Sequence, residues 1–305
     1  MIQLEHLSKE YNGLPAVSDL TIGIPEGEIF GLLGPNGAGK STTILMLVGL
    51  IQPSSGRCLV DGIDVAKDPI AVKQRIGYMP EDVGFYPTLT AVENLAYFAK
   101  LYRMDREPAK KRIAELLALT GLDGVTKEVG GYSKGMRQRL GLAKALLNDP
   151  SIIILDEPTA NLDPKGVADY RRIITAVAGE GKTVIVSSHI LAEVSRISTS
   201  VGILSAGRLV AHGAWEDLAE TAGQGTHATV TLHIETLDPM PEISRTGILS
   251  ITYSRDRLKA TVVAESDLRD SLAEILIAHG TRLRGLSRES RSLEDLFLSY
   301  YEAAA

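Results

Sequence analysis

A glycine-rich segment between residues 34 and 41 has the residue types and the spacing of a phosphate-binding loop. It reads Gly-Pro-Asn-Gly-Ala-Gly-Lys-Ser and matches Gly-x-x-x-x-Gly-Lys-Ser at every fixed position. The apolar run 29–33 precedes it, as a buried strand should. In such a loop backbone N–H groups surround phosphates, the lysine reaches the β- and γ-phosphates, and the serine hydroxyl ligates Mg²⁺. The residues expected to contact a nucleoside triphosphate are Gly34, Asn36, Gly37, Ala38, Gly39, Lys40, Ser41 and Thr42.

Two adjacent carboxylates, Asp156 and Glu157, follow a second apolar run at 152–155. The carboxyl ends of parallel strands face the ligand crevice, and we expect this strand to neighbour the strand that precedes Lys40. Asp156 is then expected to hold Mg²⁺ together with Ser41, and Glu157 to polarise the attacking water. The pair is also compatible with a structural role as the cap of the following helix. No Asn/Thr-Lys-x-Asp segment is present, which disfavours a small GTPase.

Four further segments make the chain similar to the ATP-binding cassette (ABC) ATPases over roughly residues 1–220. In chain order they resemble an adenine-stacking aromatic (Tyr11), a signature motif (132–140), a D-loop (Asn161-Leu162-Asp163) and a switch histidine (His189). The resemblance implies that ATP and Mg²⁺ are the ligands and that Glu157 and His189 are catalytic. It also implies that the intact Asp156-Glu157 pair hydrolyses ATP, which opposes a regulator that only binds nucleotide.

The signature segment departs from the commonest form, Leu-Ser-Gly-Gly-Gln, at three of five positions and keeps Ser133 and Gly135. In this family a helix beginning at that serine contacts the γ-phosphate held by a second subunit. The resemblance therefore implies a head-to-tail dimer, most simply a homodimer, in which Ser133, Lys134, Gly135 and Met136 act on the partner's ATP. Lys134 either adds a positive charge at that contact or is a solvated helix residue.

Glu81, in the segment 77–82, stands where the resemblance leads one to expect glutamine. Mg²⁺ favours carboxylate oxygens, so Glu81 is one candidate metal ligand besides Ser41 and Asp156. The alternative is that Glu81 turns outward and pairs with a cation on a membrane subunit.

Buried strands separated by helical stretches predict an α/β fold, which the resemblance makes a P-loop NTPase core of ABC ATPase type. We expect an antiparallel β subdomain at the N-terminus, a helical subdomain near 84–150, and a nucleotide-binding domain over 1–222. The helical stretches predicted inside that domain are 90–104, 107–120 and 133–147. The buried strands are predicted at 29–33, 151–155 and 183–186.

A small C-terminal accessory α+β domain is predicted over 223–305, after a linker-like segment at 223–226. Its expected elements are a strand at 229–234, two strands around 255–257, a helix after Ser266 that ends at Gly280, and a last helix at 292–301. The first of these helices carries an apolar stripe, Leu268, Leu272, Ile275 and Leu276.

The net charge and the distribution of apolar residues restrict the partners and the location that we expect for this chain. The 305 residues carry a formal net charge of −6, which argues against nucleic acid as the main partner. The longest apolar run, 44–51, is too short to span a bilayer, and the N-terminus lacks the pattern of a signal peptide. We therefore expect a cytoplasmic protein. The resemblance to ABC ATPases further implies a position on the inner face of the cell membrane, bound to integral membrane permease subunits.

The family resemblance also suggests a subclass. Residues 292–297 resemble the ending of ATPases that serve ABC-2 exporters. The signature and the loop at 80–81 resemble the ATPase of the nitrous-oxide-reductase maturation (copper-site) transporter. The rival interpretation is a soluble ABC ATPase that does mechanical work on a macromolecular complex and transports nothing.

Overall fold

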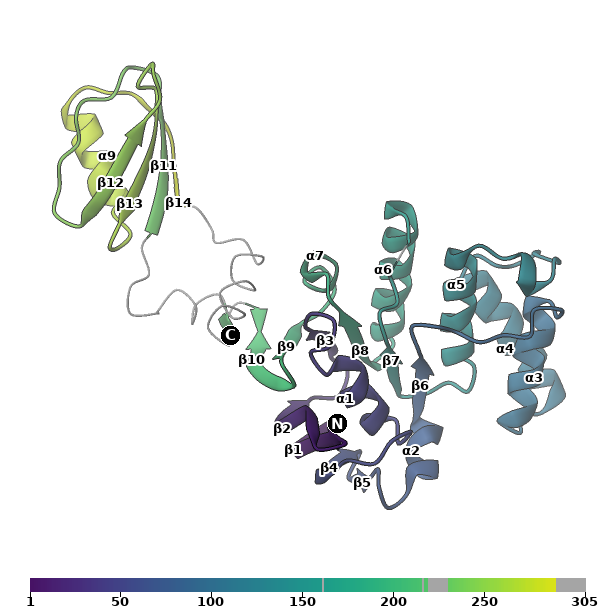
Figure 1. Cartoon of the computed structure of the whole chain (residues 1–305). Coiled ribbons are helices and arrows are strands. Elements are labelled where there is room, and N and C mark those ends of the chain that lie inside the picture. The colour runs from purple at the N-terminus through teal and green to yellow at the C-terminus, as the bar shows by residue number, and fades with distance from the viewer. Residues whose placement is uncertain (161, 216, 219–229, 289–305) are drawn as a thin grey trace. The chain divides into compact units, whose positions relative to one another are not determined.

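The computed structural model describes residues 1–160, 162–215, 217–218 and 230–288 (Figure 1). The chain divides into two compact units near residue 215. Four features predicted from the sequence lie outside the described residues: Asn161, the linker at 223–226 with the boundary after residue 222, position 229, and the helix at 292–301. No helix among the described residues has the length and apolar character needed to cross a membrane.

A six-stranded sheet forms the centre of the first unit, in the order β10-β9-β3-β8-β7-β6. Its strands are β3 (Ile29–Leu33), β6 (Ile76–Met79), β7 (Ile152–Leu155), β8 (Thr183–Ser188), β9 (Ser200–Ser205) and β10 (Arg208–Ala214). All pair in parallel except β10, which is antiparallel to β9. The apolar runs of β3, β7 and β8 follow from this position, because both faces of the central strands are covered.

One sequence-based expectation about this sheet is wrong. The strand before Lys40 and the strand before Asp156 are not neighbours, because β8 lies between β3 and β7. Leu32 of β3 is the register partner of Ser187, and Leu155 of β7 is the partner of Val186. The loop and the carboxylates therefore meet across the end of an intervening strand.

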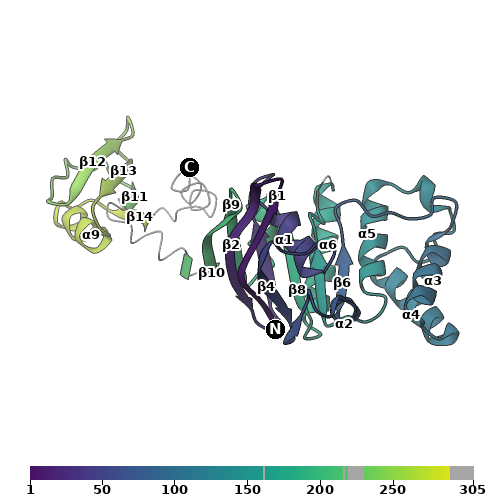
Figure 2. The same cartoon turned by 60° about the horizontal axis from the view of Figure 1, so that its bottom comes forward.

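An antiparallel sheet, in the order β2-β1-β4-β5, packs with helix α1 (Lys40–Leu47) on one face of the central sheet. Its strands are β1 (Ile2–Tyr11), β2 (Leu14–Ile24), β4 (Ser55–Val60) and β5 (Ile63–Asp64), and helix α2 (Pro69–Arg75) follows them. Figure 2 shows β1, β2 and β4 on one side of α1 and β8 on the other. Apolar residues such as Leu4, Phe30, Ile44 and Ile185 form one buried cluster there, and this burial holds α1 against the sheet.

The helical subdomain contains α3 (Ala91–Leu101), α4 (Arg106–Leu119), the short 3₁₀ turn Val129–Gly131 and α5 (Lys134–Ala145). These helices confirm the three predicted stretches. Thr90 begins α3 with a reciprocal capping box: its hydroxyl accepts from the Glu93 N–H, and the Glu93 carboxylate accepts from the Thr90 N–H.

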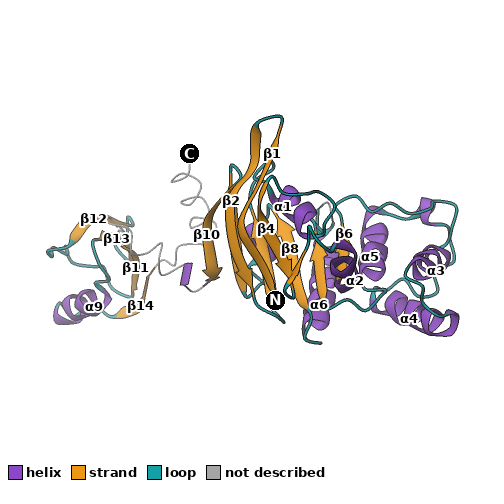
Figure 3. Ribbon diagram, turned by 90° about the horizontal axis from the view of Figure 1, so that it is seen from below, coloured by secondary structure: helices purple, strands orange, loops and turns teal. Residues whose placement is uncertain are grey.

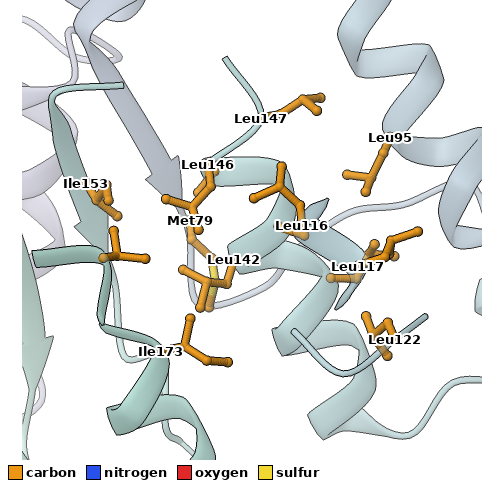
Figure 4. Packing of buried hydrophobic residues seen from close by; sticks show 14 of the residues in the cluster. Met79, Leu95, Leu116, Leu117, Leu122, Leu142, Leu146, Leu147, Ile153 and Ile173 are labelled. Atoms are coloured by element: carbon orange, nitrogen blue, oxygen red, sulfur yellow. The ribbon is translucent and has the colours of Figure 1, made fainter. Parts of the chain in front are cut away.

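The helices α3, α4 and α5 share a core with the face of the central sheet that α6 (Pro164–Ala178) covers. Figure 4 shows side chains from α4 and α5 against Met79 of β6, Ile153 of β7 and Ile173 of α6. A single turn, α7 (Leu191–Val194), follows β8. This continuous packing connects α5, which carries the predicted signature segment, to the strand that precedes Asp156 and Glu157.

The second unit is a four-stranded antiparallel sheet, in the order β12-β13-β11-β14, with α9 on one face (Figure 3). Its elements are β11 (Val230–Thr236), β12 (Ile248–Tyr253), β13 (Lys259–Ala264), α9 (Arg269–Ala278) and β14 (Leu283–Arg288). Leu272 and Leu276 of the predicted stripe are buried, and Leu268 and Ile275 pack against them. Gly280 follows the helix with a φ of 73°, so the predicted end of this helix is confirmed.

The predicted start of α9 is wrong. Ser266 does not cap the helix, which begins at Arg269 after Leu268 and has no side-chain cap. The neighbouring Asp267 accepts from the Arg269 N–H at 3.2 Å and also binds the Arg269 guanidinium. A local turn of this kind competes with a serine cap for the free N–H groups.

Candidate active site

The phosphate-binding loop joins the end of β3 to the start of α1. Gly39 stands immediately before the helix with a φ of 99°, and a Cβ there would lie 2.7 Å from the Ala16 carbonyl oxygen. Only glycine tolerates both conditions. The N-terminus of α1, with the partial positive charge of its free N–H groups, consequently opens onto the loop.

Lys40 is a buried cation, with 5% of its surface exposed. Its Nζ donates to the carbonyl oxygens of Gly34 at 2.7 Å and Pro35 at 3.2 Å. It also lies 3.1 Å from Glu157 Oε1. Burial of an ammonium requires such partners, since an unpaired charge at this depth is very costly. The structure thus brings the loop lysine and the predicted catalytic carboxylate into direct contact.

Asp156 is also buried, and two hydroxyl groups contact its Oδ1. Ser187 Oγ donates to it at 2.6 Å, and Ser41 Oγ lies 3.4 Å away. Hydroxyl and carboxylate oxygens are the ligands that Mg²⁺ prefers, and Mg²⁺ usually needs only one or two protein groups besides phosphates and water. The donor set therefore fits Mg²⁺.

Tyr78 of β6 is a half-buried phenol on the strand that pairs with β7. Burial, and after it the negative charge of Asp156, raise the pKa of Tyr78 to about 12. The phenol stays protonated at neutral pH and does not compete as a charged metal ligand.

Glu157 is held at both its side chain and its main chain. Its Oε2 lies 2.8 Å from His189 Nδ1. An ionised carboxylate only accepts, so the hydrogen of this bond belongs to the histidine. The main chain of Glu157 has a φ of 48°, and its N–H donates to Ser187 Oγ at 2.9 Å. Lys40 and His189 therefore approach the two different oxygens of one carboxylate.

The alternative role of the carboxylate pair as a helix cap is excluded. Asp163 caps α6 instead, and its Oδ1 accepts from the Gly166 N–H at 2.9 Å. Gly135 of the signature segment lies next to this region, since a Cβ at Gly135 would be 3.4 Å from Leu162. The signature segment and the D-loop region are therefore neighbours within one chain.

Ser133 begins α5, and its Oγ accepts from the Met136 N–H at 3.2 Å. Ser133 and Lys134 are exposed, whereas Met136 packs against the core of the helical subdomain. Figures 1 and 2 show α5 separated from α1 by β6 and α6. The start of the signature helix is accordingly exposed and far from the loop of its own chain.

Two further predicted residues, Tyr11 and Glu81, are exposed. Tyr11, the last residue of β1, is 46% exposed, and the Lys9 ammonium lies 5.2 Å from its ring centroid. Glu81 is exposed two residues after the end of β6, and its main-chain oxygen accepts from Gln138 Nε2 at 3.2 Å. The remaining loop residues differ in exposure: Asn36, Gly37 and Ser41 are exposed, Gly39 and Thr42 are half-buried, and Gly34 and Ala38 are buried.

Comparison with known proteins agrees with this geometry. The family model of the ABC transporter matches residues 17–160. The chain is 36% identical to the linearmycin resistance ATP-binding protein LnrL of Bacillus subtilis (strain 168), over 98% of this chain and 97% of that protein. It is 44% identical to the bacitracin transport ATP-binding protein BcrA of Bacillus licheniformis, over 69% and 68% of the two chains. This chain belongs to the ABC transporter family of ATP-binding proteins.

A solved structure supports the same assignment at the level of the fold. The dimeric, post-hydrolysis ATP-binding cassette MJ0796, bound to ADP and Pi, matches with a TM-score of 0.65 and 28% identity. The match covers 70% of this chain and 98% of that chain. The first unit is thus an ABC ATPase cassette, a fold that binds ATP and hydrolyses it.

Ser187 is the site residue that the motifs of the ABC ATPases did not reveal. It contacts the Asp156 carboxylate and the Glu157 main-chain N–H, and the strand predicted at 183–186 ends before it. The available signal was a polar pair, Ser187-Ser188, at the carboxyl end of a buried strand and directly before His189.

Proposed function

We propose that this chain is the Mg²⁺-dependent ATPase subunit that drives export through separate integral membrane subunits. The observation that carries the catalytic part is the contact of buried Lys40 with Glu157, beside Asp156. The transport part is supported by relatives named for antibiotic resistance and bacitracin transport, one of which aligns over 98% of this chain. Such a subunit would act on the cytoplasmic face of the membrane.

In this mechanism the loop N–H groups and Lys40 bind the phosphates of ATP. Ser41 and Asp156 would hold Mg²⁺, which neutralises phosphate charge when bound. The ammonium group of Lys40 moves from Glu157 Oε1 to a phosphate oxygen. This movement leaves the carboxylate oxygen free to bind the attacking water. Glu157 orients this water and accepts its proton, while His189 keeps the carboxylate in place through Oε2.

The complete site would require a second copy of the chain. Ser133 is exposed at the N-terminus of α5, where a hydroxyl and free N–H groups suit a phosphate. The dimeric state of MJ0796 supports a head-to-tail homodimer in which Ser133, Lys134 and Gly135 meet the partner's ATP and Asp163 lies at the interface. Tyr11 would stack on adenine, which suits its exposed ring.

Three narrower assignments are part of the proposal. The names of the relatives and the segment 292–297 favour the ABC-2 class of exporters. The signature and the loop at 80–81 leave the copper-site transporter as the specific hypothesis for the substrate, although the relatives described above have other names. The domain after residue 223 would be an accessory or dimer-stabilising unit, so a chain that ends near Gly223 should keep ATP binding.

Fractionation of cells tests the transport role. We expect the chain to co-purify with membranes and to lose this association when the adjacent membrane subunit is deleted, while Lys40→Ala, a control, keeps it. Recovery of the chain with ribosomes or another soluble complex, irrespective of the membrane subunit, would favour the rival function.

A further inference from the structure

We infer that Ser187 is a positioning residue for the ATPase site, whose one hydroxyl group fixes both Asp156 and Glu157. This inference rests on the proposed hydrolysis of ATP at that site. Ser187 belongs to β8, the strand that lies between the strand before the loop and the strand before the carboxylates.

The register of the central sheet places Ser187 level with the carboxylates. β8 lies between β3 and β7, and Val186 is paired with Leu155, the residue before Asp156. The residue after Val186 is Ser187, and the residue after Leu155 is Asp156, so these two residues lie side by side. Ser187 has no exposed surface, so its hydroxyl can bond only to protein groups around it.

The direction of both hydrogen bonds follows from the chemistry of the partners. The Glu157 N–H can only donate, so Ser187 Oγ accepts it at 2.9 Å. The hydroxyl hydrogen then points to Asp156 Oδ1 at 2.6 Å, a short bond of the kind formed to an ionised acceptor. A single hydroxyl can donate one hydrogen bond and accept up to two, and the Ser187 hydroxyl here accepts one and donates one.

One of these hydrogen bonds stabilises the backbone of Glu157, and the other holds the carboxylate of Asp156 in place. Glu157 has a left-handed backbone, which is unfavourable for a residue with a side chain. The bond from its N–H to Ser187 offsets part of that cost and directs the carboxylate toward Lys40 and His189. The bond to Asp156 Oδ1 holds this carboxylate beside Ser41, the other residue that would hold Mg²⁺.

Removal of the hydroxyl should consequently affect two properties at once. Groups that orient a metal ligand typically contribute 10- to 100-fold to metal affinity or activity. We expect Ser187→Ala to lower kcat by about 10-fold or more and to raise the Mg²⁺ concentration for half-maximal rate by a similar factor. Ser187→Cys is nearly isosteric but has only a weak donor, so it should resemble Ser187→Ala.

Thr183→Val is the matched control. Thr183 is a buried hydroxyl at the opposite end of the same strand, where its Oγ1 accepts from the Gly27 N–H at 2.9 Å. The variant removes a buried hydrogen bond from β8 and leaves the carboxylates untouched. It should lose stability to an extent comparable with Ser187→Ala but keep the wild-type kcat and Mg²⁺ requirement.

The experiment uses the full chain and has three readouts: the ATPase rate against Mg²⁺ concentration, the melting temperature, and Mn²⁺ binding in the presence of ADP by electron paramagnetic resonance. Weaker Mn²⁺ binding and a raised Mg²⁺ requirement in both Ser187 variants, but not in Thr183→Val, support the inference. Wild-type values of both in folded Ser187→Ala or Ser187→Cys overturn it. If the wild-type chain shows no turnover that Lys40→Ala abolishes, the proposed function itself fails, and the inference fails with it.

Discussion

Lys40 Nζ and Glu157 Oε1 lie 3.1 Å apart, although the two residues follow strands β3 and β7, which β8 separates. Both side chains are more than nine-tenths buried. The carboxylate oxygen that would orient water is therefore occupied by the ammonium that would bind phosphate. In the proposed mechanism, arrival of the phosphate would relieve this competition, so that nucleotide binding and activation of the general base would be one event.

The shared site of a dimer can be tested by complementation between two inactive chains. Ser133→Arg puts a long cation at the exposed start of α5 and should abolish hydrolysis while it nearly spares ATP binding to the monomer. Lys40→Ala should remove phosphate binding in its own loop. Because the two defects lie in different halves of the composite site, a mixture should regain one working site per heterodimer, measured as ATPase rate against mixing ratio. A mixture that stays inactive although heterodimers form would contradict the shared site.

Glu81→Gln separates two roles for Glu81, which lies in the loop after β6. If the Glu81 carboxylate ligates Mg²⁺, loss of its charge should raise the Mg²⁺ concentration needed for half-maximal rate, since Mg²⁺ prefers charged oxygen ligands. The exposed position of Glu81 also permits an outward role toward a membrane subunit. An unchanged Mg²⁺ curve combined with lost coupling to that subunit would rule out ligation. Asp82→Asn, at the next exposed position, is the control.

The chemistry-bearing segments were predictable because each motif is local in sequence. The loop, the carboxylate pair and His189 each occupy a few consecutive residues, and strand ends place them at one edge of the sheet. The order of the strands is not local. Only long-range pairing decides that β8 lies between β3 and β7, so the role of Ser187 could not be predicted from the motifs.

Short elements with few β-forming residues also escaped prediction. Strand β6 has four residues, one of which is Gly77. A Cβ at Gly77 would lie 2.0 Å from the Ala145 carbonyl oxygen, so the glycine permits close approach of the α5 end and does not mark a turn. Strand β14, Leu283–Arg288, contains no β-branched residue and is formed through its pairing with β11.

Asp149 connects the helical subdomain to the central sheet and should make stability depend on pH. Its carboxylate accepts from Lys182 Nζ at 2.7 Å and from Arg112 Nη2 at 3.3 Å. The hydrogen bond from Lys182 is the main cause that lowers the pKa of Asp149. A depressed carboxyl pKa stabilises the fold at pH values above the unfolded value of about 3.9, and this contribution is lost as the pH falls through the folded value.

We therefore expect Asp149→Asn to lower the free energy of unfolding at pH 7, measured by urea unfolding, by up to about 1 kcal/mol. The effect is small because the Asp149 side chain is largely exposed. The difference from wild type should shrink below about pH 4. Asp169→Asn, which removes an exposed i,i+3 pair with Arg172, is the control and should change little. A difference between Asp149→Asn and wild type that is the same at all pH values would contradict the ionic origin of the effect.

The most direct test of the account is the ATPase rate of Glu157→Gln in the full chain with Mg²⁺. Glutamine keeps the size of the side chain, and its amide oxygen can accept the hydrogen bond from His189 as the carboxylate does, so the fold and ATP binding should persist. Loss of the general base should lower the rate by about 10²–10⁴. ATP-bound dimers should then accumulate, as seen by size-exclusion chromatography. Near-wild-type turnover in this variant would contradict the central claim that Glu157, released by Lys40, activates the water.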